Sequence, residues 1–209
     1  MLIRSPAILC ASRTHSEHGA ILRLLTAERG LVGAYLAGAK GKELRPLLVP
    51  GNLLDTQILD RGDSRLPSVR IELLESRGPW LTEPLPAAGI GWVCTLTAAS
   101  LPERHPYPAI HSALSATLDA ICKAPSARGW AIAVAAYETL VLRELGYGGK
   151  DHDMSEIAHL AEPEWPDLLH HLHRQGRAIE SRLLAERRHD VMGSRAILLD
   201  RLKRISGEG

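Results

Sequence analysis

The spacing of apolar residues changes near residue 80, and this change constrains the fold more than any other feature of the chain. Before it, short apolar runs alternate with turn sequences rich in Gly, Pro, Asp and Ser. After it, apolar residues recur every three or four positions over long stretches. The first pattern is typical of strands and the second of helices. We therefore predict an α+β chain, with a β domain over residues 1–80 and an all-α domain over residues 81–209.

Five apolar runs predict five short strands in the first domain. They cover residues 6–11, 20–26, 31–39, 52–59 and 69–74. Residues 27–30 separate the second run from the third and form a tight-turn sequence, in which Gly30 is free to adopt a positive φ. Five strands in so short a segment favour a small closed or nearly closed barrel, because closure leaves no unpaired sheet edge.

The second domain contains apolar residues at helical spacing. Two sets each predict a buried helix face: Ile110, Leu114, Leu118 and Ile121, and then Ile132, Ala136, Leu140 and Leu145. Gly146 follows the second set and predicts the end of that helix. We expect further helices at residues 155–160, 165–185 and 194–205. The uncharged stretch 84–102 contains several Gly, Pro, Thr and Ser residues, so it predicts a buried helix rather than a membrane span.

Charge is unevenly distributed along the chain. The formal net charge is +1, but residues 1–80 carry a net +3, residues 81–173 a net −6 and residues 174–209 a net +4. Such asymmetry is compatible with a polyanionic partner on one basic face. Solvated faces that merely differ in sign explain the same pattern, and composition does not separate the two interpretations.

Cysteine usage and the first residues favour a cytoplasmic location. Cys10, Cys94 and Cys122 are far apart and form no CxxC motif, which fits a reducing compartment. The chain begins without the apolar core of a signal peptide.

Catalytic motifs are absent from the sequence. It contains no G-x-S-x-G elbow, no H-E-x-x-H motif and no G-x-G-x-x-G loop. Lys40 and Lys42 lie among glycines, but their spacing is not that of a phosphate-binding P-loop and Glu43 follows. We therefore predict a binding protein rather than an enzyme.

The strongest metal candidate is the cluster of His170, His171 and His173. On a helix His170 and His173 share a face while His171 points elsewhere, and no cysteine or clear carboxylate completes a tetrahedral set. Asp151, in the loop after the glycines, is the further ligand that could contribute. A polar helix face explains the histidines better, so no metal and no cofactor are predicted.

Basic residues of the first domain outnumber its acidic ones, and cations on a loop can bind phosphates without reading bases. Tyr35 is the only aromatic residue among the first 79, so base stacking by this domain should be poor. The basic tail includes Arg174, Arg177 and Arg188 at helical intervals, as well as Arg195. These residues could form a stripe that binds a polyanion, or they could serve only to keep the protein soluble, and the sequence favours neither interpretation decisively.

Several segments together resemble the RecO family of bacterial DNA repair and recombination mediators. They are Ser12-Arg13, Ser16-Glu17, residues 25–30, Gly38-Ala39-Lys40 with Lys42, residues 50–54, Tyr137-Glu138, residues 142–148 and Gly193-Ser194-Arg195. They occur in the family's order and span most of the chain.

The resemblance implies an oligonucleotide-binding (OB) barrel followed by a helical domain. It further implies binding of single- and double-stranded DNA, annealing of complementary strands, and action with RecR, in many bacteria with RecF, to replace single-strand-binding protein by RecA. The acidic C-terminal tail of single-strand-binding protein is an implied partner. Many members carry a four-cysteine zinc module after the segment matching 142–148. Residues 149–209 contain no cysteine, so no zinc module is expected here.

The same resemblance implies the site residues. Lys40 and Lys42 match the family's basic loop, and the full set of expected DNA contacts is Arg13, Arg23, Arg29, Lys40, Lys42 and Arg45. A groove for the acidic tail needs a cation beside an apolar pocket, and Arg128 and Arg143 are the expected cations.

Two alternatives remain at this point. The chain could be a protein-interaction adaptor that docks a basic partner on its acidic middle region. It could instead be a metal-dependent enzyme that uses His170, His173 and Asp151.

Overall fold

The first 75 residues form a five-stranded barrel. The structure is a computed structural model, and it describes residues 1–15, 17–60, 62, 66–148, 164–185 and 191–207. The strands are β1 (Leu2–His15), β2 (Gly19–Thr26), β3 (Gly30–Ala37), β4 (Leu53–Leu59) and β5 (Ser68–Glu75). The five predicted strands are confirmed, and β1 is longer than its apolar run because its polar ends also pair.

The strands close in the order β1-β2-β3-β5-β4, with β4 pairing back to β1. All pairs are antiparallel except β3 and β5, which are parallel and meet at Tyr35 and Ser68. This is the strand order of an OB barrel, so the predicted fold is confirmed. Gly30 adopts a φ of +66° in the β2–β3 turn, as expected from the turn sequence.

One bulge lets β1 serve both the barrel and the helices. The pairing register with β2 shifts between Leu9 and Ala11, which places Cys10 at the bulge. Leu9 belongs to the apolar interior of the barrel, whereas Ile8 and Cys10 face the other way and join the core of the helical region. Bulges of this kind bend a strand sharply, and the bend allows β1 to pair with β2 and β4 in turn.

The rest of the described chain is helical. Two short 3-10 helices flank the last strands: η1 (Arg45–Leu47) lies between β3 and β4, and η2 (Gly78–Thr82) follows β5. The longer helices are α1 (Pro84–Ser100), α2 (Pro108–Lys123), α3 (Ala127–Glu144), α5 (Trp165–Ala178) with the π-helical extension η4 (Ile179–Leu183), and α6 (Met192–Ser206). The predicted helix at 155–160 lies outside the described residues. Within the described part of the chain, no helix is long and apolar enough to cross a membrane.

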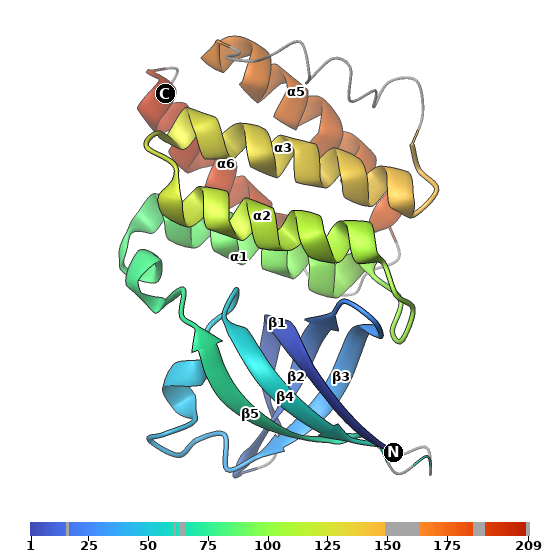
Figure 1. Cartoon of the computed structure of the whole chain (residues 1–209). Coiled ribbons are helices and arrows are strands. Elements are labelled where there is room, and N and C mark those ends of the chain that lie inside the picture. Colours follow the sequence, from blue (N-terminus) through green and yellow to red (C-terminus); the bar gives the residue numbers. More distant parts are fainter. Residues whose placement is uncertain (16, 61, 63–65, 149–163, 186–190, 208–209) are drawn as a thin grey trace.

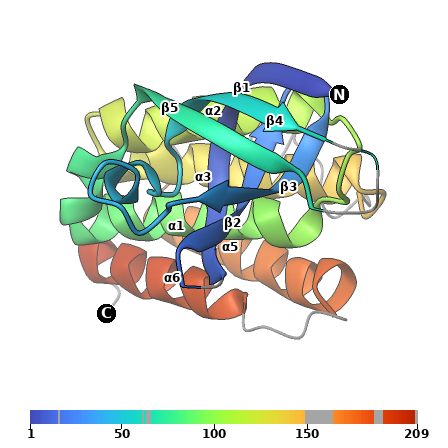
Figure 2. The ribbon, with the colours of Figure 1, turned by 90° about the horizontal axis from the view of Figure 1, so that it is seen from below.

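Helix α1 packs against one end of the barrel. Figure 1 shows α1 and α2 next to the barrel, with α3 and α5 beyond them, and Figure 2 views the barrel in front of this helical layer. The helix is apolar on all sides because it is buried on several sides. Leu25 and Leu31 of the barrel share one continuous core with Ile90 and Trp92 of α1. The barrel end that faces the helices is therefore closed.

Helix α3 buries a different face from the one the sequence predicted. Ile132, Ala136 and Leu140 are only half-buried. The buried residues are Trp130, Ala131, Val134, Ala135, Tyr137, Glu138, Thr139, Val141 and Leu142. The prediction of this face was wrong because it followed the aliphatic residues alone. The face that packs against the other helices also contains the aromatic residues Trp130 and Tyr137 and the polar residues Glu138 and Thr139. The helix ends as expected before Gly146, which has a φ of +86°.

A buried ion pair and its hydrogen bonds join four helices of this region. Arg195 of α6 donates from Nε and Nη2 to the two carboxylate oxygens of Glu138 in α3, each at 2.8 Å, and Trp92 Nε1 of α1 donates to the same carboxylate at 2.7 Å. Arg195 also donates to the Leu172 carbonyl at 2.5 Å, and its guanidinium would collide with any side chain at Gly176. The sequence counted Arg195 as part of a basic tail, and this was wrong because the residue is only 3% exposed.

Replacing Arg195 should therefore cost far more stability than replacing an exposed arginine. Arg195→Met leaves the Glu138 carboxylate buried without its cation, and we expect the free energy of unfolding to fall by about 3–5 kcal/mol. The matched control is Arg204→Met on the same helix, which removes an exposed pair with Asp200 and should cost below about 1 kcal/mol. Urea unfolding followed by circular dichroism measures both, and equal losses would contradict the structural role of the buried pair.

The interface between barrel and helices should also protect two thiols. Burial raises the pKa of the Cys10 thiol to about 12 and that of Cys94 well above its ordinary value. Partial burial also raises the pKa of Cys122, but this thiol is only half-buried and so stays accessible to a reagent. At pH 8, where the buried thiols stay protonated, Ellman's reagent should modify Cys122 alone in the native protein. Cys10 and Cys94 should react only in denaturing urea. Equal rates for all three would show that the barrel separates from α1 under native conditions.

Candidate nucleic-acid interface

The loop between β3 and β4 carries the basic residues Lys40, Lys42 and Arg45 and is held firmly against the barrel. Gly38 has a φ of +71°, and backbone hydrogen bonds join Gly41 to Gly38 at 2.8 Å and Arg45 to Gly41 at 3.0 Å. Ala39 is buried in the barrel interior, and Leu44, Leu47 and Leu48 pack against it. The apolar residues thus pin the loop, and its cations are left exposed.

Asn52 fixes the far end of this loop. Its side chain is fully buried, its amide donates to the Leu47 carbonyl at 3.1 Å, and its side-chain oxygen accepts from the Arg77 backbone N–H at 2.7 Å. Its backbone carbonyl accepts from Leu9 at 2.9 Å, beside the bulge of β1. The segment 50–54, which carried part of the family resemblance, therefore ties the basic loop to β1 and to the exit of β5.

A hollow of about 420 Å³ lies beside the loop at the barrel end that faces away from the helices. Lys40 and Arg45 line it together with two hydroxyl residues of β1, Ser12 and Thr14, which alternation places on one side of the strand. Its remaining walls are Gly19, Ala20, Ala39 and Leu48. Sequence reasoning did not name Ser12 and Thr14 as site residues, because the predicted first strand ended at residue 11 whereas β1 continues to His15.

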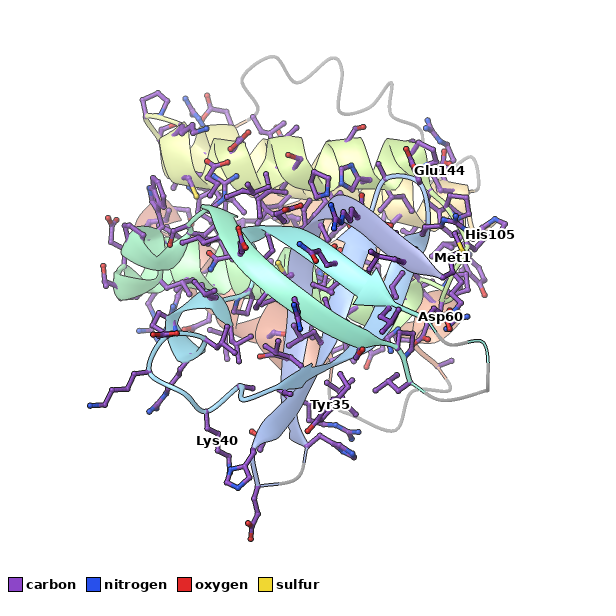
Figure 3. The ribbon with its side chains drawn as sticks, turned by 60° about the horizontal axis from the view of Figure 1, so that its bottom comes forward. Met1, Tyr35, Lys40, Asp60, His105 and Glu144 are labelled. Carbon is purple, nitrogen blue, oxygen red and sulfur yellow. The ribbon has the colours of Figure 1, made fainter. Side chains whose placement is uncertain are left out.

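The cations of this end are electrostatically free. Among the described residues, no carboxylate lies within ion-pair distance of Lys40, Lys42, Arg45 or Arg13. Figure 3 shows Lys40 and Tyr35 on the part of the barrel that faces away from the helices. An anion approaching this end meets positive charge that no internal partner neutralises, beside hydroxyl groups that can donate hydrogen bonds.

The other expected DNA contacts do not all join this hollow. Arg13 lies between Ser12 and Thr14 on β1, so its side chain projects from the opposite, outer side of the strand. Arg23 is half-buried and donates to Glu103 at 3.1 Å, so its charge is already paired.

Arg29 lies at the other end of the barrel. It belongs to the β2–β3 turn, next to the α1–α2 connection, where Arg104 N–H donates to the Leu31 carbonyl at 2.8 Å. The eight residues of β3 separate this turn from the basic loop, a distance of about 25 Å at the rise of an extended strand. Arg29 therefore does not share a face with Lys40.

The expected partner cations in the helical region are also separated. Arg143 lines a mainly apolar groove of about 300 Å³ between α2 and α3, formed with Ala113, Ala116, Thr117, Ala133, Ala136, Tyr137 and Leu140. Arg128 lies near the other end of α3, where it is 3.9 Å from Glu164. The half-buried residues Ala136 and Leu140, which the sequence assigned to a core face, are thus walls of this groove.

The tail and the histidines form no second site in the described residues. Arg188 and Asp151 lie outside them. His171 is buried, His170 is exposed, and His173 contacts the Leu169 carbonyl at 2.7 Å, so the three histidines do not converge. No group of three metal-ligating side chains occurs in the part of the chain that the structure describes.

Two family models match the chain in the order expected from its fold. The model described as Recombination protein O N terminal matches residues 1–77, and the model described as Recombination protein O C terminal matches residues 83–149. The chain belongs to the RecO family. The first match covers the barrel with its basic loop, and the second covers α1, α2 and α3 with the apolar groove.

Individual RecO proteins show the same relationship. The DNA repair protein RecO of Caulobacter vibrioides is 33% identical over 187 residues, which cover 89% of this chain and 73% of the relative. The DNA repair protein RecO of Jannaschia sp. is 34% identical over 177 residues, which cover 84% of this chain and 69% of the relative. That of Ruegeria sp. is 36% identical over 146 residues, covering 69% of this chain and 59% of the relative. The family membership supports a role in DNA repair and recombination.

Proposed function

We propose that this RecO protein is a non-enzymatic recombination mediator that binds single- and double-stranded DNA through the basic end of its barrel. The observation that carries the proposal is the pinned loop, which presents Lys40, Lys42 and Arg45 beside the hydroxyls of Ser12 and Thr14, with no carboxylate of the described residues within ion-pair distance. Such a surface suits phosphate groups, and phosphate contacts set affinity and position without reading sequence. This matches a mediator that must act on any damaged sequence.

Annealing follows from the same charge. Two complementary strands repel each other through their phosphates, and cations that bind both strands lower this repulsion. The protein needs no reacting group for this step because base pairing supplies the favourable free energy. We propose that it acts in the cytoplasm at the nucleoid with RecR, and with RecF where present, to help RecA replace single-strand-binding protein.

The groove between α2 and α3 is proposed to bind the C-terminal tail of single-strand-binding protein. Such a tail ends in acidic residues and an aromatic residue, and the groove offers an apolar floor with the Arg143 guanidinium at its edge. Arg143 is more than half exposed and contacts Glu144 at 3.3 Å, a weak surface pair that a carboxylate of the tail can replace.

Charge reversal in the basic loop should weaken DNA binding in a salt-dependent manner. A close pair of unit charges in water is worth about 1 kcal/mol, so Lys40→Glu should weaken single-strand binding by at least about fivefold. The slope of log affinity against log salt should shrink by about 0.7 for each phosphate that the variant no longer binds. Fluorescence anisotropy with a labelled oligonucleotide over a range of salt concentrations measures both quantities.

The matched control is Arg29→Glu, which makes the same change of net charge at the other end of the barrel. Both the affinity for the oligonucleotide and the slope of log affinity against log salt should stay within a factor of about two of the wild-type values, since charges separated by more than a Debye length are screened. Equal losses in the two variants would assign the effect to overall charge rather than to the loop. Binding by the wild-type protein that does not depend on salt would overturn the proposal.

Reversal of the groove cation should affect tail binding but not DNA binding. Arg143→Glu should weaken binding of a labelled peptide with the tail sequence by at least about tenfold, because it replaces a charge-assisted hydrogen bond with repulsion. Arg128→Glu, near the other end of α3, serves as the control and should have a smaller effect. Fluorescence polarisation of the peptide is the measurement, and a larger loss in Arg128→Glu would move the peptide site away from this groove.

A further inference from the structure

Two aromatic rings meet on the outer surface of the barrel. His15 lies at the end of β1 and Tyr35 on β3, and β2 runs between these strands. The residue of β2 between them is Gly19, where an added Cβ would collide with the Tyr35 ring. The missing side chain lets the rings approach edge to face, with centroids 6.1 Å apart and planes at 82°. The barrel therefore carries a two-ring platform that the count of aromatic residues did not reveal.

Positive charge flanks this platform on two sides. Arg13, Ile21 and Tyr35 are register partners across β1, β2 and β3, which places the unpaired Arg13 on the same outer surface. On the other side, Gly19 is at once the residue under the Tyr35 ring and part of the wall of the hollow that contains Lys40 and Arg45. A strand whose phosphates occupy the basic hollow thus has its neighbouring base within reach of the rings.

The surroundings of Tyr35 also offer room for a base. Strands β3 and β5 pair only at Tyr35 and Ser68, and a hollow of about 920 Å³ opens where they diverge. Tyr35 lines it with Leu36 and Leu44, and the charged residues on its walls are Asp55, Glu72 and Arg70. Because the two carboxylates outnumber the single guanidinium, these walls repel phosphates on balance but tolerate an uncharged base. The backbone of a bound strand should therefore stay on the Lys40 side, with the base turned towards the rings.

We infer that Tyr35, with His15 beside it, is a stacking site for an unpaired nucleobase, and that it gives this barrel a preference for single-stranded over duplex DNA. The inference rests on the proposed DNA binding and adds the recognition of bases to that of phosphates. Stacking on an aromatic ring is available to every base, so the preference is for strandedness and not for sequence. Bases paired in a duplex are stacked on each other and cannot reach the rings.

Strands with and without bases test this inference. The full-length protein is titrated into a labelled oligothymidylate of about 16 nucleotides, the upper site size of one such barrel. A strand of equal length built from abasic units is titrated at the same salt concentration. Wild type should bind the thymidine strand about tenfold more tightly, within the range measured for stacking of one base. Tyr35→Ala should lose this difference and keep its affinity for the abasic strand.

Control variants separate stacking from folding. Tyr35→Trp should retain or increase the preference for bases, because the larger ring stacks at least as well. Tyr147→Ala removes an exposed tyrosine from the helical region and should bind both strands as wild type does. Melting curves by circular dichroism establish that Tyr35→Ala is folded at the assay temperature; if it is not, the comparison of wild type with Tyr35→Trp on both strands decides.

Each remaining outcome overturns a definite claim. If wild type binds the abasic strand as tightly as the thymidine strand, stacking is refuted while phosphate binding stands. If Tyr35→Ala weakens both strands equally, the ring only covers Gly19 and supports the sheet. If wild type binds neither strand, the proposed DNA binding fails and the stacking site fails with it.

Discussion

Closure of one barrel end by α1 is the constraint on which the rest of the molecule depends. Leu25 and Leu31 at this end are fully buried in a core shared with α1, and Ile8 and Cys10 reach the same core because they alternate along β1 with Ala7 and Leu9, which face the barrel interior. A ligand of the barrel can therefore approach only from the opposite end or from the sides. The basic loop, the Ser12 and Thr14 hydroxyls and the Tyr35 ring all lie towards that free end.

The position of the basic loop is set by buried polar groups. Asn52 is buried and uses both ends of its amide, one towards Leu47 and one towards Arg77. Arg77 in turn contacts Glu75 at 3.0 Å and Asp119 of α2 at 2.8 Å, so the connection from barrel to helices passes through this cluster. Lys40 and Arg45 are thus presented by a fixed scaffold, and little ordering entropy is lost when an anion binds.

Local patterns were sufficient to predict the elements of the fold. Strand alternation, the turn before Gly30 and the stop at Gly146 act over a few residues, and each was identified from the sequence. The partners of the charged residues could not be identified from the sequence, because these residues contact groups that are far away along the chain. Glu138 and Arg195 are 57 positions apart, and a count of charges assigns one to an acidic region and the other to a basic tail. Arg23 is likewise neutralised by Glu103, 80 positions away.

The candidate site shows the same division between local and non-local information. The cations of the loop were visible as Lys and Arg between glycines, and the sequence named them. The meeting of His15 and Tyr35 was not visible, since it needs two hairpin registers and a glycine on the middle strand. A count of one aromatic residue predicted poor stacking, whereas the register places a second ring beside the first.

A small stacking site fits an annealing protein better than an extensive one. A barrel that stacked every base along a strand would compete with base pairing and hold its substrate single-stranded. Cations without any stacking would bind duplex and single strand alike and would release neither selectively. In the proposed site, one ring pair beside a basic hollow would hold a strand by its phosphates and one base, and would leave the neighbouring bases free to find their complement. As pairing proceeded, the stacked base would be withdrawn into the duplex, and the interaction that distinguishes the single strand from the duplex would end.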